Sequence, residues 1–394
     1  MSSVIPKEEL LEHVLISAIS HTASRLPGTE IWNKAQISRE PTTIFDINGE
    51  PLFYDYPVVE GRTVLGHMRA SASKILGAPV VASELGPRIW DQKTAVDRLT
   101  ASFKQKFPGL TVKDTRLVCY SYPKLGIMFQ ATDRVGTLSR HIFDVADLSP
   151  IPEKRDRPKI EGAYAWSFYE FLTSDMRRER TGRYEQIDRR RAEITTHERV
   201  SMAQAASLGE YVATKPAWLG AVVAVSKTKM LQFCTHYAYN ESRSHHCFVL
   251  HGQQKNDYCA VATCQMILCY YRYYYTQDQI APALGYAPGG CPSDQSPGYE
   301  KLSCNHIDAT YDTSPTWTEA RDQIDALHPL KSGISGHARA CAGYSSNTLT
   351  GVNQLYIYDP WPWNVDYKVG GAVYWEDWSS IPHTNYVFTR LTCP

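Results

Sequence analysis

The chain has 394 residues, which is enough for two or three domains with buried cores. Its 41 basic and 41 acidic residues cancel, so no overall charge favours binding to nucleic acid or to an anionic membrane surface. The sequence contains no uninterrupted run of about 18 apolar residues, so no membrane-spanning helix is predicted. We therefore expect a folded protein with no nucleic-acid partner and no membrane span.

The first predicted element is an amphipathic helix close to the N-terminus. Apolar residues recur there at helical spacing, namely Leu10, Leu11, Val14, Leu15 and Ile19. Acidic residues precede the apolar run VLISAIS, which is unlike the basic start of a secretory signal. Without a recognisable signal peptide, the default expectation is a cytoplasmic protein.

Residues from about 40 to 150 predict a small α+β domain. Four segments look like strands because β-branched and aromatic residues alternate between turn signals. They are FDINGEPLFYDYPV, RTVLGHMRASASKI, RLVCYSYPKLGIMFQAT and RHIFDVADL. The segment DQKTAVDRLTASFKQKFPG predicts a helix that ends at Pro108 and Gly109. Residues 1–150 are therefore expected to form an N-terminal α+β domain.

A mainly helical connecting region is predicted over residues 151–245. Its first part, SPIPEKRDRPK, is rich in proline and charge and indicates a linker. Residues 165–194 then have helical character, interrupted at Gly182. The arginines between Arg177 and Arg191 alternate with acidic residues, which favours a solvated, salt-bridged helix face over a nucleic-acid site.

The cysteines are concentrated towards the C-terminus. Of ten, only Cys119 precedes residue 230. In a secreted protein, Cys291 and Cys304 could pair across the Gly/Pro/Ser-rich loop between them. The lopsided distribution indicates that the two halves of the chain have different tasks.

The segment QQKNDYCAVATCQMILCYY, residues 253–271, predicts a buried helix with Asn256 or Asp257 as its cap. Three cysteines follow one another at a spacing of five, which rotates each by about 140° from the last. They therefore cannot converge on one metal ion, and no metal is expected. Cys259 lies in the first turn, where the positive end of the helix dipole stabilises a reactive thiolate.

A cysteine nucleophile needs a base, a group that orients the base, and donors for the oxyanion. In HPLKSGISGHARACAGY, His337 follows two glycines and opens an apolar run, while QLYIYDPWPWN ends an apolar strand at Asp359. On adjacent strands these two residues would lie side by side. Gln253, six residues before Cys259, can fold back to face an oxyanion together with the Cys259 amide.

Residues 253 to about 360 resemble the papain-like cysteine peptidases, most closely the branch that processes bacteriocin leaders. The matching pieces are the glutamine, Asp-Tyr-Cys at the start of an apolar helix, MILCYY, QIAPALGY, PLKSGISGHARACAGY and YIYDP. The resemblance implies that residues 246–394 form a papain-like domain, with a helical lobe and an antiparallel sheet. It also implies catalytic roles for Gln253, Cys259, His337 and Asp359, with Gln254 and Asn364 as alternatives to the first and last.

The predicted function is hydrolysis of peptide bonds in a peptide or protein substrate, without a cofactor. The N-terminal region, which vaguely resembles protease propeptides, is expected to act as an intramolecular inhibitor in a zymogen, with THYAYNESRSHH as a candidate cleavage region. Two alternatives remain open. The same residues would serve an amidase, isopeptidase or acyltransferase, and a papain-like module could bind peptides without catalysis.

Overall fold

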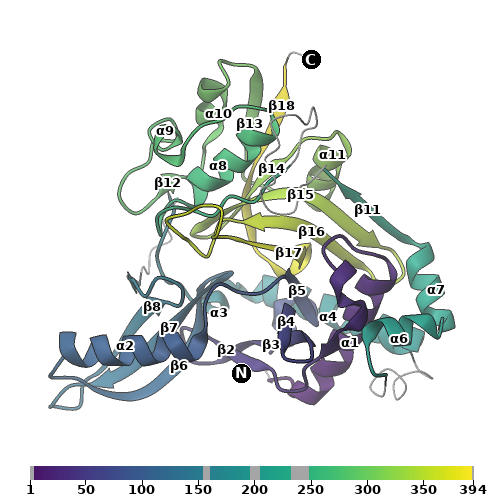
Figure 1. The fold of residues 1–394 in the computed structure, drawn as a ribbon, viewed down its shortest axis with the longest axis horizontal. Coiled ribbons are helices and arrows are strands. Elements are labelled where there is room, and N and C mark those ends of the chain that lie inside the picture. The colour runs from purple at the N-terminus through teal and green to yellow at the C-terminus, as the bar shows by residue number, and fades with distance from the viewer. Residues whose placement is uncertain (1–3, 154–159, 196–204, 232–247, 393–394) are drawn as a thin grey trace.

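The computed structural model describes residues 4–153, 160–195, 205–231 and 248–392. The protein is a mixed α+β molecule, as expected, with the N-terminal half of the chain below and the C-terminal half above in Figure 1. The candidate cleavage region THYAYNESRSHH lies outside the described residues. None of the described helices is both long enough and apolar enough to span a bilayer.

The N-terminal half is built mainly from antiparallel hairpins, with one parallel strand pairing, and two α-helices pack on them. Its strands are β1 Gln36–Ile37, β2 Thr42–Asp46, β3 Pro51–Glu60, β4 Thr63–Ser71, β5 Val80–Leu85, β6 Thr111–Ser121, β7 Lys124–Thr132, β8 Leu138–Asp144 and β9 Pro150–Ile151. Its helices are α1 Lys7–Ala23, η1 Glu30–Lys34, η2 Lys74–Leu76 and α2 Gln92–Lys106. The Asp91 side chain caps α2, and the apolar side chains of Ala95, Leu99 and Phe103 face the core.

The connecting region contains short helices and one long one. Its elements are β10 Ile160–Glu161, α3 Phe168–Phe171, α4 Ser174–Thr195, α6 Leu208–Ala213, α7 Ala217–Ala224 and β11 Ser226–Met230. The prediction that Gly182 interrupts the helix is wrong, because α4 continues through it. The break falls earlier, between α3 and α4.

The arginine-rich face of α4 is only partly solvated, contrary to prediction. Arg180 is buried and donates to the carbonyl of Ser380 at 2.7 Å. Arg183 makes two hydrogen bonds of 2.8 Å to the Asp377 carboxylate. Both side chains therefore connect α4 to the C-terminal half. Arg183 does so through two parallel hydrogen bonds between its guanidinium and a carboxylate.

The C-terminal half combines a helical part with an antiparallel sheet. Its helices are α8 Cys259–Tyr270, α9 Gln277–Ile280, α10 Ser296–Leu302, α11 Trp317–Asp325 and η3 Trp378–Ser380. Its strands are β12 Cys291–Pro292, β13 Ile307–Asp312, β14 Leu330–Ile334, β15 His337–Asn347, β16 Val352–Asp359, β17 Ala372–Asp377 and β18 His383–Leu391. Thr316 and Glu319, at the T-x-x-E spacing that indicates a helix start, form a capping box at the beginning of α11.

One sheet runs through both halves of the molecule. Strand β17 of the C-terminal half pairs antiparallel with β5 of the N-terminal half, and Trp375 lies opposite Ser83. From the connecting region, β11 pairs with β15. The two halves therefore share backbone hydrogen bonds across their junction, where Figure 1 shows β5 and β17 next to each other.

Trp375 is expected to be a principal stabiliser of this junction. Its side chain is fully buried, its indole N–H donates to the Pro27 carbonyl at 3.0 Å, and its ring centroid lies 4.6 Å from that of Tyr356. Trp375→Ala should lower the free energy of unfolding by about 3–5 kcal/mol, as measured by denaturant titration. The exposed residue Val135 provides the control, since Val135→Ala should have little effect. A Trp375→Ala loss as small as the control's would contradict this role.

Candidate active site

His337 and Asp359 form a buried pair at one end of adjacent strands. His337 is the first residue of β15, and Asp359 is the last of β16, which pairs with β15. The His337 Nε2 atom lies 2.7 Å from Asp359 Oδ1, and neither side chain is exposed to solvent. The structure thus brings together the imidazole and the carboxylate that the sequence placed on neighbouring strands.

The Asp359 carboxylate is held by three donors. Besides the imidazole, the Trp361 backbone N–H donates to Oδ1 at 2.8 Å and the Tyr374 hydroxyl donates to Oδ2 at 2.7 Å. Burial alone would raise the pKa of Asp359, but His337 and the other partners outweigh it, and the pKa lies below its usual range. Asn364, the alternative to Asp359, instead accepts from the Asp366 amide in a turn.

Cys259 begins α8 and is completely buried. The predicted caps do not form: Tyr258 is the cap residue, and Asp257 accepts from the Tyr286 hydroxyl and the Gly289 amide. The backbone amide of Ala338, the residue after His337, is close enough to the Cys259 thiol to lower its pKa, so the sulfur lies at the same end of β15 as the imidazole. Burial raises the pKa of the Cys259 thiol, with a smaller opposing effect from the Lys124 ammonium.

The second imidazole nitrogen, Nδ1 of His337, is buried and has no hydrogen-bond partner among the described residues. Burial lowers the pKa of His337 to about 4, although Asp359 acts in the opposite direction. Loss of solvation thus favours the neutral form of both the His337 imidazole and the Cys259 thiol. The described conformation accordingly favours a neutral thiol and a neutral imidazole.

Gln253 is buried beside the loop that follows β16. Its backbone N–H donates to the Pro360 carbonyl at 2.9 Å. The side-chain amide donates to the carbonyls of Lys255 and Asn256, both at 2.8 Å, and Oε1 has no partner among the described residues. To face an oxyanion, this amide would have to give up one of those two bonds. The alternative, Gln254, donates its amide to the Val365 carbonyl.

The N-terminal half covers this site with the turn between β6 and β7. Lys124, at the start of β7, is fully buried, and its Nζ donates to the carbonyls of Gly162 at 2.8 Å and Gly336 at 3.3 Å. The Ser121 hydroxyl is 3.4 Å from the Ser335 carbonyl. From the other side, the Trp361 indole donates to Asp144 at 2.8 Å.

Sequence reasoning missed two of these neighbours. Neither Lys124 nor Tyr374 carries a local signal, because each reaches the site only through tertiary contacts. Lys124 donates to a carbonyl 212 positions away, and the Tyr374 hydroxyl reaches Asp359 from the neighbouring strand β17. A small pocket at the same junction is lined by residues of both halves, among them Arg69, Glu84, Tyr122, Asp359 and Tyr374.

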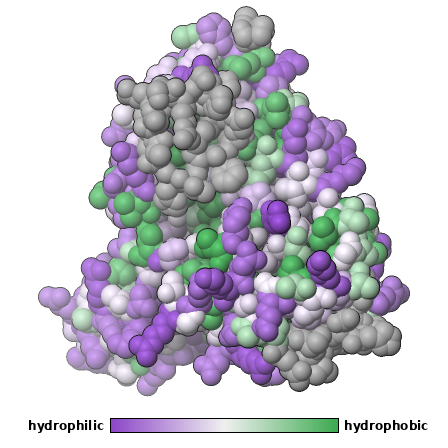
Figure 2. All heavy atoms as spheres, turned by 45° about the vertical axis from the view of Figure 1, so that its right-hand side comes forward, coloured by the Kyte–Doolittle hydropathy of each residue, from purple (hydrophilic) through white to green (hydrophobic). Residues whose placement is uncertain are grey.

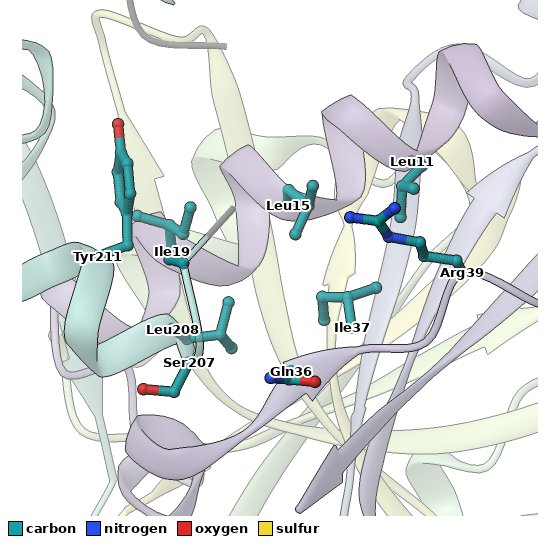
Figure 3. Close-up of a pocket in the computed structure, with 10 residues that line it drawn as sticks. Leu11, Leu15, Ile19, Gln36, Ile37, Arg39, Ser207, Leu208 and Tyr211 are labelled. Carbon is teal, nitrogen blue, oxygen red and sulfur yellow. The ribbon is translucent and has the colours of Figure 1, made fainter. Parts of the chain in front are cut away.

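A separate hollow lies between α1, β1 and α6 (Figure 3). Its floor is apolar, with Leu15, Ile19 and Leu208 pointing into it, and Arg39 and Gln36 lie at its border. None of the four predicted site residues lines it. Figure 2 shows a face largely covered by hydrophilic residues, with hydrophobic residues in small groups.

The seven cysteines that the structure describes are all free, so the pairing of Cys291 with Cys304, considered for a secreted protein, is not formed. Cys291 is buried whereas Cys304 is exposed. Cys264 is fully buried and Cys269 partly so, as is usual for cysteines that pack as small hydrophobic residues. Within the described residues, no group of three or more potential ligands could hold a metal ion.

Residues 248–382 match the model of the Peptidase C39-like family, which is less than half of the chain. The matched range includes Gln253, Cys259, His337 and Asp359. The match supports a papain-like, cysteine peptidase-type domain in the C-terminal half. No curated protein matches the chain.

Thiol labelling should reveal how the site is covered. With iodoacetamide at pH 7, Cys304 should be alkylated well before Cys259, because Cys304 is exposed whereas Cys259 is fully buried with a raised thiol pKa. Peptide mapping by mass spectrometry after brief labelling gives the order. In denaturant, both thiols should react at comparable rates. Faster alkylation of Cys259 in the native protein would contradict the covered arrangement.

Proposed function

We propose that this protein is a cysteine peptidase with Cys259 as nucleophile, His337 as general base and Asp359 as the residue that orients the imidazole. The observation that carries the proposal is the 2.7 Å contact between His337 and Asp359 at the same end of β15 as the Cys259 sulfur. It leaves Nδ1 of His337 without a partner in a buried position. Such a nitrogen is available for the thiol proton.

The proposed reaction is acyl transfer to water. Nδ1 of His337 takes the proton of Cys259, and the thiolate attacks the carbonyl carbon of the substrate. The backbone N–H of Cys259 and the amide of Gln253 stabilise the oxyanion. His337 then gives its proton to the leaving amine, and afterwards it activates the water that hydrolyses the thioester.

We further propose that the described conformation is the latent form of a zymogen. Burial acts against the thiolate and the imidazolium at once, since it raises the pKa of Cys259 and lowers that of His337. The turn that carries Lys124 is part of the cover, since the Lys124 ammonium donates to the carbonyls of Gly162 and Gly336 beside the site. Movement or removal of this cover would admit water and favour the ion pair.

Substitutions at the site should separate the roles. Cys259→Ala should reduce peptide cleavage to background, and Gln253→Ala should lower kcat by about 10²- to 10³-fold. Asp359→Ala should lower kcat by about 10²- to 10⁴-fold, because the imidazole loses its acceptor. Asp359→Asn is the matched control. The side-chain carbonyl of this variant can still accept a hydrogen bond from His337 Nε2, so its kcat should fall less than that of Asp359→Ala.

These effects are measured with fluorogenic peptides, and circular dichroism checks that each variant is folded. Equal activity of Cys259→Ala and the unsubstituted protein would rule out the proposed nucleophile. Adding a primary amine to the assay distinguishes hydrolysis from acyl transfer, since an acyltransferase would incorporate the amine into the product.

The zymogen proposal predicts a shorter product. On incubation, the purified chain should be processed while activity appears, and Cys259→Ala should stay intact. Intact mass spectrometry follows both samples over time, with a peptide assay in parallel. Full activity of a chain that remains unprocessed would eliminate the requirement for removal of the N-terminal region.

A further inference from the structure

Residues 160–162 of this chain lie between the helical part of the C-terminal half and its sheet. Strand β10 pairs antiparallel with β12, so that Ile160 lies opposite Pro292 and Glu161 opposite Cys291. On the other side, the Gly162 N–H donates to the Gly336 carbonyl at 3.2 Å. Gly336 directly precedes His337. The segment is thus held in an extended form by both walls, as peptides are when they add to a strand.

The same segment lies close to the nucleophile. The charges of Glu161 and Lys124 both act on the Cys259 thiol. A side chain at position 162 would have no room, because its Cβ would come within 1.8 Å of the Gly289 carbonyl oxygen. The Gly162 carbonyl accepts from Lys124, as described above. Gly162 therefore fits a narrow passage between the two walls, beside the proposed catalytic residues.

The Glu161 side chain enters a fully enclosed polar pocket. Its Oε1 lies 2.5 Å from Lys331 Nζ, and its Oε2 accepts from Gln295 at 2.7 Å. Asn385 donates to Oε1 at 3.3 Å. The exposed fractions of the Glu161 and Lys331 side chains are 1% and 0%.

The pocket is assembled from both parts of the C-terminal half. Gln295 precedes α10, Lys331 lies on β14, and Asn385 lies on β18. Lys331 is further held by the Ser293 carbonyl at 3.0 Å and by Asn385 Oδ1 at 2.5 Å. A buried ammonium without an anionic partner is strongly destabilising, so the pocket requires a negative charge.

We infer that Lys331, Gln295 and Asn385 form a specificity pocket for an acidic side chain, which Glu161 of the chain itself occupies. The inference rests on the proposed peptidase function. It implies that the preferred substrates carry glutamate directly before glycine, in the arrangement of Glu161 and Gly162. The internal segment then competes with such substrates for one groove.

The test compares three peptides that differ only at the residue before glycine: Ile-Glu-Gly-Ala, Ile-Gln-Gly-Ala and Ile-Lys-Gly-Ala, each with a fluorophore. The full chain carries Glu161→Ala, which removes the internal carboxylate from the pocket. Cleavage is measured with this variant. Binding is measured by fluorescence anisotropy with the same variant carrying Cys259→Ala as well, so that no turnover interferes.

The glutamate peptide should bind about 100-fold more tightly than the glutamine peptide, because only the carboxylate pairs with buried Lys331. The glutamate peptide should bind more weakly, by at least about tenfold, to a Cys259→Ala chain that retains Glu161 than to the chain that carries both substitutions. The internal segment of the first chain then competes with the peptide. Adding Lys331→Glu to the Glu161→Ala chain should shift the preference to the lysine peptide. Lys331→Met keeps the length of the side chain and should abolish the preference for glutamate over glutamine.

The comparison of glutamate with glutamine needs no Lys331 variant, so it remains decisive if one of those fails to fold; circular dichroism checks that the Glu161→Ala chain is folded. Equal binding of those two peptides, or no binding of the glutamate peptide at 1 mM, would overturn the inference and leave Glu161 and Lys331 as a structural ion pair only. Selective binding without cleavage of any peptide, both before and after the incubation that should process the chain, would instead refute the proposed peptidase function while supporting the pocket. The two failures are therefore distinguishable.

Discussion

The antiparallel pairing of β17 with β5 is the constraint on which the arrangement of this molecule depends. It joins the hairpins of the N-terminal half to the sheet that carries His337 and Asp359, so both halves belong to one hydrogen-bonded sheet. The N-terminal strands are thereby held beside the proposed catalytic residues, and Lys124 donates to the carbonyls of Gly162 and Gly336 there.

This burial determines the chemical state of the site. A thiol and an imidazole that are both removed from water favour their neutral forms, because neither charge is solvated. Asp359, by contrast, is surrounded by donors that stabilise its negative charge. The site therefore combines an oriented imidazole with a proposed nucleophile in its unreactive form, which suits the proposed latent enzyme.

A shared sheet also affects how such an enzyme could be activated. Complete removal of the N-terminal half would leave β17 without its neighbour β5, and loss of β11 would uncover β15. Unpaired strand edges expose backbone donors and acceptors that favour aggregation. Release of the segment around Glu161 and Gly162 would open the groove while leaving the sheet intact, so a local change requires less disruption than the loss of a domain.

The sequence by itself determined the elements whose signals are local. The helix that starts at Cys259, the capping box of α11 and the two strands ending near His337 and Asp359 each follow from residues a few positions apart. Hydrophobic periodicity and capping act over such short distances, so they can be read from the chain directly. The same reasoning identified the wrong cap for α8 and an interruption at Gly182, because tertiary packing outweighed local preference there.

Only the tertiary structure decided what surrounds those elements. Lys124 and Gly336 are 212 positions apart, and Glu161 and Lys331 are 170 apart, so no local pattern relates them. Their contacts arise because the common sheet and the groove beside it bring distant strands together. Once these charged groups are buried, water no longer screens the interactions between them. The residues proposed for the chemistry could be named from the sequence, whereas their enclosure and the occupant of the groove depend on the folded chain.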